Sequence, residues 1–242
     1  MDNDASHTAS HKDTPDPQHA EITRLGSLTL IVAVAYAVTG YIGFALAIPP
    51  GNVSILWLPS GIAMAAVLIR GYQAIPGILL GAVVINIQSF YNGSLDSLPF
   101  MTILAILMIS IGNALPPLIG RYLLRRFGNI LNPFDSGQSI LQSSLIFAAA
   151  CTVSASIGAL SLSLAGLVDG SPYKLLGTWW LGDFIGALSF TPLLLSVVRQ
   201  SRFVALSLLA VAIVSFGGTY AISNHVRNQA IEAWENQASR EA

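Results

Sequence analysis

Charged residues are scarce in this chain. Asp, Glu, Lys and Arg make up 10% of its 242 residues, whereas soluble domains contain roughly 25%. Hydrophobic residues make up 53%, and the mean hydropathy is +0.66. These values exclude a soluble enzyme and predict a protein embedded in the lipid bilayer. The formal net charge of −1 also argues against a nucleic-acid partner.

Residues that commonly carry out catalysis or bind metals are equally rare. The single cysteine, Cys151, lies in an apolar run, which excludes a disulfide framework. No histidine falls in a long apolar segment, and His7 and His11 lie in a proline-containing tail that would not hold a metal. We find no nucleophile beside a base, no HExxH motif and no phosphate loop. We therefore expect no enzyme activity, no cofactor and no metal site in this chain.

Long apolar segments dominate the rest. A spanning helix needs about 20 such residues, with a range of roughly 17–25. We predict an all-α integral membrane bundle of about seven helices, with a carboxyl-terminal amphipathic helix. The expected spans are Leu25 to Ile48, Ile55 to Arg70, Ala74 to Phe90, Leu98 to Leu118, Ser139 to Val168, Leu175 to Val198 and Phe203 to Ile222.

Some of these spans have unusual features. The second and third are short, and the fifth is long enough to be tilted or broken near Ser154 and Gly158. Pro116-Pro117 predicts a bend or break late in the fourth.

The segments outside the spans divide the chain into three parts. Residues 1–24 are polar and are predicted to form a disordered tail, and residues 25–222 form the membrane domain. Residues 223–242 carry an apolar stripe at four-residue intervals, typical of an amphipathic helix. We interpret this last piece as an exit helix that leads to a downstream region or pairs with its copy in a homodimer. The alternative is a helix lying on the membrane surface.

The positions of Lys and Arg predict the orientation. With seven spans, eight of the 11 fall on one side: Lys12, Arg24, Arg70, Arg121, Arg125, Arg126, Arg199 and Arg202. Lys174, Arg227 and Arg240 fall on the other. We therefore expect a cytoplasmic amino terminus and place residue 242 outside the cell membrane. Splitting the fifth segment into two spans would make the distribution less asymmetric, which favours one span there.

Asp183 is the only carboxylate well inside a long apolar segment, within Trp179-Trp180-Leu181-Gly182-Asp183. A charge in that position costs a few kcal/mol or more unless it is paired, protonated or hydrated. Trp179 and Trp180 either anchor the helix at the membrane interface or form aromatic walls beside the acid. Structural pairing, ligand contact and proton relay all remain open roles for Asp183.

Further polar residues are candidates for the same site. Trp57 and Ser60 open the second span, where Ser60 can cap the helix and free N–H groups favour an anion. Asn86 and Asn113 either line a pocket or bond across helices. Two GxxxG pairs, Gly77 with Gly81 and Gly182 with Gly186, allow close helix packing; these four glycines are the predicted packing residues.

An ordered set of these motifs resembles a known family. It comprises Trp57-x-Pro59-Ser60-Gly61-Ile62-Ala63, Pro76-Gly77-(x3)-Gly81-(x4)-Asn86, Gly112-Asn113 before Arg125-Arg126, and Trp179-Trp180-x-Gly182-Asp183-(x2)-Gly186-(x4)-Thr191-Pro192. Together they resemble the first class of bacterial membrane-associated sensor domains (MASE) over about Leu28 to Val198. Leu58 replaces the first of the family's usual two prolines.

The resemblance implies a signal-input module in the bacterial inner membrane. In that family the module is fused to histidine kinases, diguanylate cyclases or cyclic-di-GMP phosphodiesterases, often through an extracytoplasmic CHASE domain. The family's ligands are mostly unknown, so we expect an unidentified small ligand or a partner protein. Two alternatives remain: a small-molecule transporter or substrate-capture subunit, which the short and proline-containing spans favour, and a dimerising scaffold without a ligand.

Overall fold

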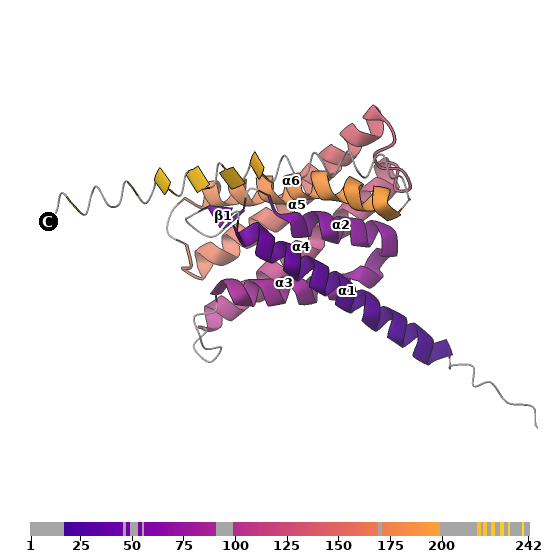
Figure 1. Ribbon diagram of the computed structural model, residues 1–242, viewed down its shortest axis with the longest axis horizontal. Coiled ribbons are helices and arrows are strands. Elements are labelled where there is room, and N and C mark those ends of the chain that lie inside the picture. Colours follow the sequence, from indigo (N-terminus) through magenta and orange to yellow (C-terminus); the bar gives the residue numbers. More distant parts are fainter. Residues whose placement is uncertain are drawn as a thin grey trace, which may run out of the picture.

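The computed structural model is a bundle of α-helices (Figure 1). It describes residues 17–45, 47–48, 53–54, 56–90, 99–168 and 171–198, with scattered residues between 217 and 239. Over the continuous part the helices are α1 (Pro17–Ala45), α2 (Leu58–Arg70), α3 (Ile75–Phe90), α4 (Phe100–Phe127), α5 (Gly137–Leu164) and α6 (Pro172–Val198). A 3₁₀ turn, η1 (Gly71–Ala74), joins α2 to α3. The two-residue strands β1 (Ala47–Ile48) and β2 (Val53–Ser54) form an antiparallel pair after α1.

Five of the described stretches are long and apolar enough to cross a membrane. One of them, Leu58–Phe90, contains both α2 and α3, and the chain reverses between them at η1 (Figure 1). Gly71 allows this reversal because its φ of 68° lies in the left-handed region that side chains disfavour. The predicted second and third spans are therefore two short antiparallel arms, of 13 and 16 residues.

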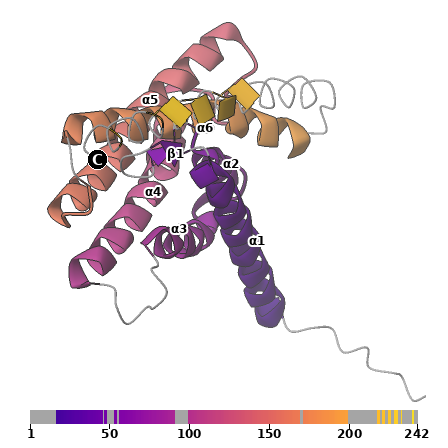
Figure 2. The same ribbon diagram turned by 60° about the vertical axis from the view of Figure 1, so that its left-hand side comes forward.

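The contacts between helices show that they alternate in direction. Gly77 and Gly81 of α3 lie against the backbone of Thr29 and Ala33 of α1, so α1 and α3 run parallel. On α5, Gly158 lies against Trp179 of α6, and Ser154 bonds to Asp183 of α6. The numbers fall on one helix as they rise on the other, so α5 and α6 are antiparallel. Figure 2 shows α1 at one side of the bundle, beside α2 and α3 and away from α5.

Arginine side chains gather at one end of this bundle. Arg70 ends α2, and Arg121, Arg125 and Arg126 lie in the last two turns of α4. The Arg121 guanidinium donates hydrogen bonds from one nitrogen to the carbonyl oxygens of Val67 (2.8 Å) and Leu68 (3.1 Å) in the last turn of α2. A cation in this position interacts favourably with the partial negative charge at the carboxyl end of a helix. Arg121 therefore joins α4 to α2, besides contributing to the charge asymmetry.

The described helices depart from the predicted spans in two places. First, α1 begins at Pro17, so residues 17–24 of the tail predicted to be disordered are helical. Proline suits the first turn of a helix, and the hydroxyl groups of Thr23 and Ser27 bond back to the carbonyls of His19 and Thr23. The helix of the first span therefore extends beyond the predicted span at its amino end.

Second, α4 does not break at Pro116-Pro117 but continues to Phe127. The two prolines remove the backbone N–H groups that would bond to the carbonyls of Gly112 and Asn113. Both rings are buried among neighbouring helices, and such packing holds a proline-containing helix together within a membrane.

The long fifth segment is one helix without a break, and it begins at an N-cap, Ser136, whose hydroxyl accepts from the Ser139 N–H.

The predicted seventh span and exit helix lie largely outside the described residues.

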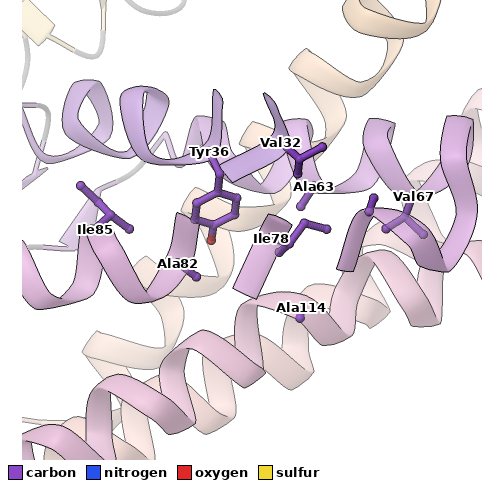
Figure 3. Close-up of a cluster of buried hydrophobic side chains, with 9 residues drawn as sticks. Val32, Tyr36, Ala63, Val67, Ile78, Ala82, Ile85 and Ala114 are labelled. Carbon is purple, nitrogen blue, oxygen red and sulfur yellow. The ribbon is translucent and has the colours of Figure 1, made fainter. Parts of the chain in front are cut away.

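The core between α1, α2 and α3 consists mainly of aliphatic and alanine side chains. Figure 3 shows Tyr36 of α1 in this core, with its ring pointing inward among Ile78 and Ala82 of α3. Tyr36 is only 1% exposed and is the largest fully buried side chain, so a phenol hydroxyl group is enclosed within the bundle.

Candidate functional site

Asp183 lies near the middle of α6 and is 1% exposed. Two hydroxyl groups donate to it. Ser60 of α2 donates to Oδ1 and Ser154 of α5 donates to Oδ2, each at 2.6 Å. An ionised carboxylate makes stronger hydrogen bonds than a neutral acceptor does. Ser60 also places Asp183 beside the first turn of α2, where the helix dipole is positive.

Further polar side chains are buried in the same part of the bundle as this carboxylate. The Ser154 hydroxyl also lies 3.3 Å from Oδ1 of Asn113 on α4. The Tyr36 phenol lies against the side chains of Trp57 and Asn113. On α3, the Asn86 amide nitrogen donates to Ser110 of α4 at 3.4 Å and to the carbonyl of Ala82 at 2.8 Å. Each of these buried polar side chains therefore has a hydrogen-bonding partner within the bundle.

A cavity of about 40 Å³ lies among them, lined by Asp183, Asn86 and Asn113. Water needs roughly 10–15 Å³ of such space, so the cavity can hold about three molecules of that size. Its buried polar residues are Asp183, Asn86, Asn113 and Ser54. Five other lining residues are partly exposed: Phe44, Trp57, Ser89, Phe90 and Trp179. Of these, Phe44, Ser89 and Phe90 lie at the ends of α1 and α3 opposite the arginine-rich end. They form a rim through which a ligand can enter. The complete lining is Phe44, Ser54, Trp57, Asn86, Ser89, Phe90, Ile109, Asn113, Leu162, Trp179 and Asp183.

The two tryptophans of this cavity are held against glycines. A Cβ atom on Gly158 of α5 would come within 2.6 Å of the Trp179 ring, and one on Gly43 of α1 within 2.8 Å of the Trp57 ring. The Trp57 ring also meets Phe44, with 5.2 Å between centroids. Glycine at these positions lets each indole lie directly against a helix backbone, so the aromatic walls are fixed by packing.

The structure brings most of the predicted site residues together. Trp57, Asn86, Asn113, Trp179 and Asp183 line one cavity, and Ser60 bonds to the carboxylate. Ser60 does not cap α2, however, because the N-cap residue is Trp57 and no side chain caps that end. Ser60 is the third residue of the helix, so its hydroxyl group faces α6 instead.

Trp180 lies apart from the cavity. Its indole nitrogen donates to the carbonyl of Ala148 on α5 at 2.9 Å, and its ring stacks on Phe184 with 5.3 Å between centroids. This tryptophan joins α6 to α5 and is not in contact with the site.

The predicted packing glycines lie where helices meet. A Cβ on Gly77 or Gly81 would come within 2.7 Å of an α1 carbonyl oxygen. A Cβ on Gly186 would collide with the Trp57 carbonyl group. Gly182 accepts a hydrogen bond at 3.0 Å through its own carbonyl from the Trp57 N–H. These contacts hold the start of α2 close to α6, beside Asp183.

Several residues of the site were not among the predicted candidates, including Phe44, Ser54, Ser89 and Phe90 of the cavity and the polar residues Ser154 and Tyr36. Ser154 is one of several serines in α5, and Tyr36 is one of two tyrosines in α1. The available signal was weak: Ser154 stands in an apolar stretch, where a hydroxyl group needs a partner. No pattern in the sequence shows which serine faces Asp183.

The arrangement suits ligand recognition by hydrogen bonds and charge. Within the described part of the chain, no group of three or more His, Cys, Asp or Glu residues could hold a metal ion. The site around Asp183 combines a hydrogen-bonded carboxylate, two amides and aromatic walls in a small cavity. Sites that bind small molecules have these features.

Comparison with known proteins agrees with this architecture. No curated protein and no solved structure matches the chain. The family model MASE1, which describes a membrane-associated sensor domain, matches residues 28–204. This match covers most of the chain, including every residue of the cavity. The chain belongs to the MASE1 family of membrane-associated sensor domains.

Proposed function

We propose that this chain is the signal-input module of a bacterial signal-transduction protein and that the Asp183 cavity is where the signal acts. The family assignment supports a sensor role. The observation that carries the proposal is that a buried carboxylate, hydrogen-bonded to α2 and α5, lines one cavity together with amides of α3 and α4. A ligand that binds there can favour one helix arrangement over another.

The coupling follows from the hydrogen bonds of Asp183. Its two oxygen atoms bond to α2 and α5, so any change at the carboxylate alters the packing of three helices. A ligand shifts such an equilibrium only by its differential affinity for the two arrangements. Couplings of about 1–3 kcal/mol, which change an equilibrium 5- to 150-fold, are typical.

In this proposal the arginine-rich end lies on the cytoplasmic side of a bacterial inner membrane, following the positive-inside rule. The cavity rim at Phe44, Ser89 and Phe90 then faces outward, where it can sample the cell's surroundings. The segment itself catalyses no reaction. It controls a fused histidine kinase or cyclic-di-GMP enzyme, and its exit helix pairs with that of a second copy.

The test replaces Asp183 with Asn in the complete protein that the gene encodes. Asn keeps the shape of the side chain but removes its charge and changes its hydrogen bonding. We expect the activity of the output domain, measured in membrane vesicles as phosphorylation or nucleotide turnover, to change at least about fivefold. The amount of protein inserted in the membrane should stay the same.

Asp135→Asn is the matched control. Asp135 is an exposed carboxylate in the connection between α4 and α5, so this change should leave output unaltered. If Asp183→Asn and Asp135→Asn both leave output and its response to stimulus as in the natural protein, the cavity is not the input site.

A further inference from the structure

The charge of the cavity lining is unbalanced. Among the described residues that line it, Asp183 is the only acidic one, and none is Lys, Arg or His. The groups that bond to Asp183 are neutral: two serine hydroxyls and the indole N–H of Trp179. A carboxylate enclosed within a bilayer normally pairs with a cation or faces water. The lining thus supplies a negative charge but no positive partner.

The hydrogen-bonding capacity of the lining is also one-sided. An ionised carboxylate offers about four acceptor positions, and the two serines and the Trp179 N–H account for three of them. The amide nitrogen of Asn86 already donates to Ala82 and Ser110, so its oxygen is the group left for the cavity. Oδ1 of Asn113 is an acceptor as well, at 3.3 Å from Ser154. A ligand that donates several N–H bonds fits this set.

Aromatic rings form much of the remaining wall, through Phe44, Trp57, Phe90 and Trp179. Their faces attract a cation within about 6 Å of the ring centre, most strongly for Trp. Metal ions of the calcium or magnesium type instead need six or more oxygen ligands, mainly carboxylate, carbonyl and water. One carboxylate with aromatic neighbours suits an organic cation better than a metal ion.

We propose that the cavity binds the ammonium group of a small primary amine, with Asp183 as its counter-ion and Trp57 and Trp179 as its walls. This inference rests on the proposed function, since it names the ligand class of the same site. The cavity of about 40 Å³ admits a group of two or three heavy atoms. A longer amine would extend its remaining atoms past Phe44 and Phe90.

The test uses the full chain in lipid nanodiscs and methylammonium chloride as the probe. Two of the chain's four tryptophans line the cavity, so binding should change tryptophan emission saturably and raise the unfolding temperature. At equal ionic strength, sodium chloride, sodium formate and methanol should give neither effect. Tetramethylammonium, which has five heavy atoms and no N–H group, should bind at least tenfold more weakly.

Variants provide a second line of evidence. Asp183→Asn should weaken methylammonium binding at least tenfold, whereas Asp135→Asn should bind like the natural chain. An equal response to methanol would show that binding does not require a positive charge, and an equal response to sodium would show a general salt effect. Either result overturns the inference, as does the absence of any response. The ligand series on the natural chain stands even if Asp183→Asn fails to fold.

The binding test is independent of the output test. If methylammonium does not bind but Asp183→Asn still changes output, the amine inference is wrong and the sensor proposal stands. If methylammonium binds but output does not depend on Asp183, the cavity is a binding site without the proposed signalling role.

Discussion

At the scale of single residues, the site depends on how one buried carboxylate is compensated. Two hydroxyl groups, from Ser60 and Ser154, each donate to Asp183 at 2.6 Å. Hydrogen bonds to charged groups contribute about 1.5–3 kcal/mol, and an acceptor left without a donor costs a similar amount. The serines therefore matter for stability as well as for recognition.

Ser154→Ala removes one of these donors and should lower the free energy of unfolding by about 2 kcal/mol. Thermal unfolding in detergent measures the change. Ser161→Ala is the control on the same helix, because the Ser161 hydroxyl bonds only to the Ile157 carbonyl within α5, at 2.6 Å. Equal unfolding temperatures for the two variants would show that Ser154 contributes nothing special to Asp183.

The sequence identified the acid and most of its neighbours for a clear physical reason. Carboxylates and amides are costly in apolar helices, so they stand out and are expected to converge. The orientation of each helix was not predictable in the same way. Trp179 and Trp180 lie four and three positions before Asp183, so both share its face by spacing, yet only Trp179 reaches the cavity. Packing against Gly158 decides between them.

At the scale of elements, glycine contacts determine how closely α6 approaches α2. A Cβ on Gly186 would collide with the Trp57 carbonyl group, and one on Gly61 would meet Phe190. The GxxxG spacing predicted such an approach but not the partner helix. The cap predicted at Ser60 was wrong, and of the bend or break predicted in α4 the break does not occur, because neighbouring helices override local preferences.

Gly186→Ala should push the start of α2 away from α6 and destabilise the fold by about 1–3 kcal/mol, the usual cost of overpacking. Gly177→Ala is the matched control on α6, since a Cβ there has nothing within 4 Å. Alanine favours a helix over glycine by up to about 1 kcal/mol, so this control should be neutral or slightly more stable. Unfolding curves in detergent for both variants provide the measurement. A stable Gly186→Ala protein would contradict the close contact.

At the scale of the whole molecule, helices α1 to α6 alternate in direction, and the two ends of the bundle differ in charge. Arg70, Arg121, Arg125 and Arg126 lie at one end, and Lys174 lies at the start of α6 at the other. Hydropathy predicted the described spans well because a bilayer requires long apolar helices. The short α2 and α3 are recognisable as two helices only because Gly71 and η1 separate them.

The orientation can be measured by labelling single cysteines in intact cells. Cys151 is buried and would first be replaced, for example as Cys151→Ala. Lys174→Cys should then react with a membrane-impermeant maleimide from outside, whereas Asn129→Cys, in the α4–α5 connection, should react only after lysis. Both positions are exposed. The reverse pattern would invert the topology and place the cavity rim toward the cytoplasm.

The sharing of one carboxylate between two helices has a mechanical consequence. Ser60 and Ser154 approach Asp183 from different helices, so α6 cannot turn about its long axis and keep both bonds unless its neighbours follow. The pair of bonds therefore defines one angular setting of α6. A ligand that displaces either serine from the carboxylate would allow α6 to rotate. That rotation would move Val198, the last residue of α6, and through it whatever the chain controls.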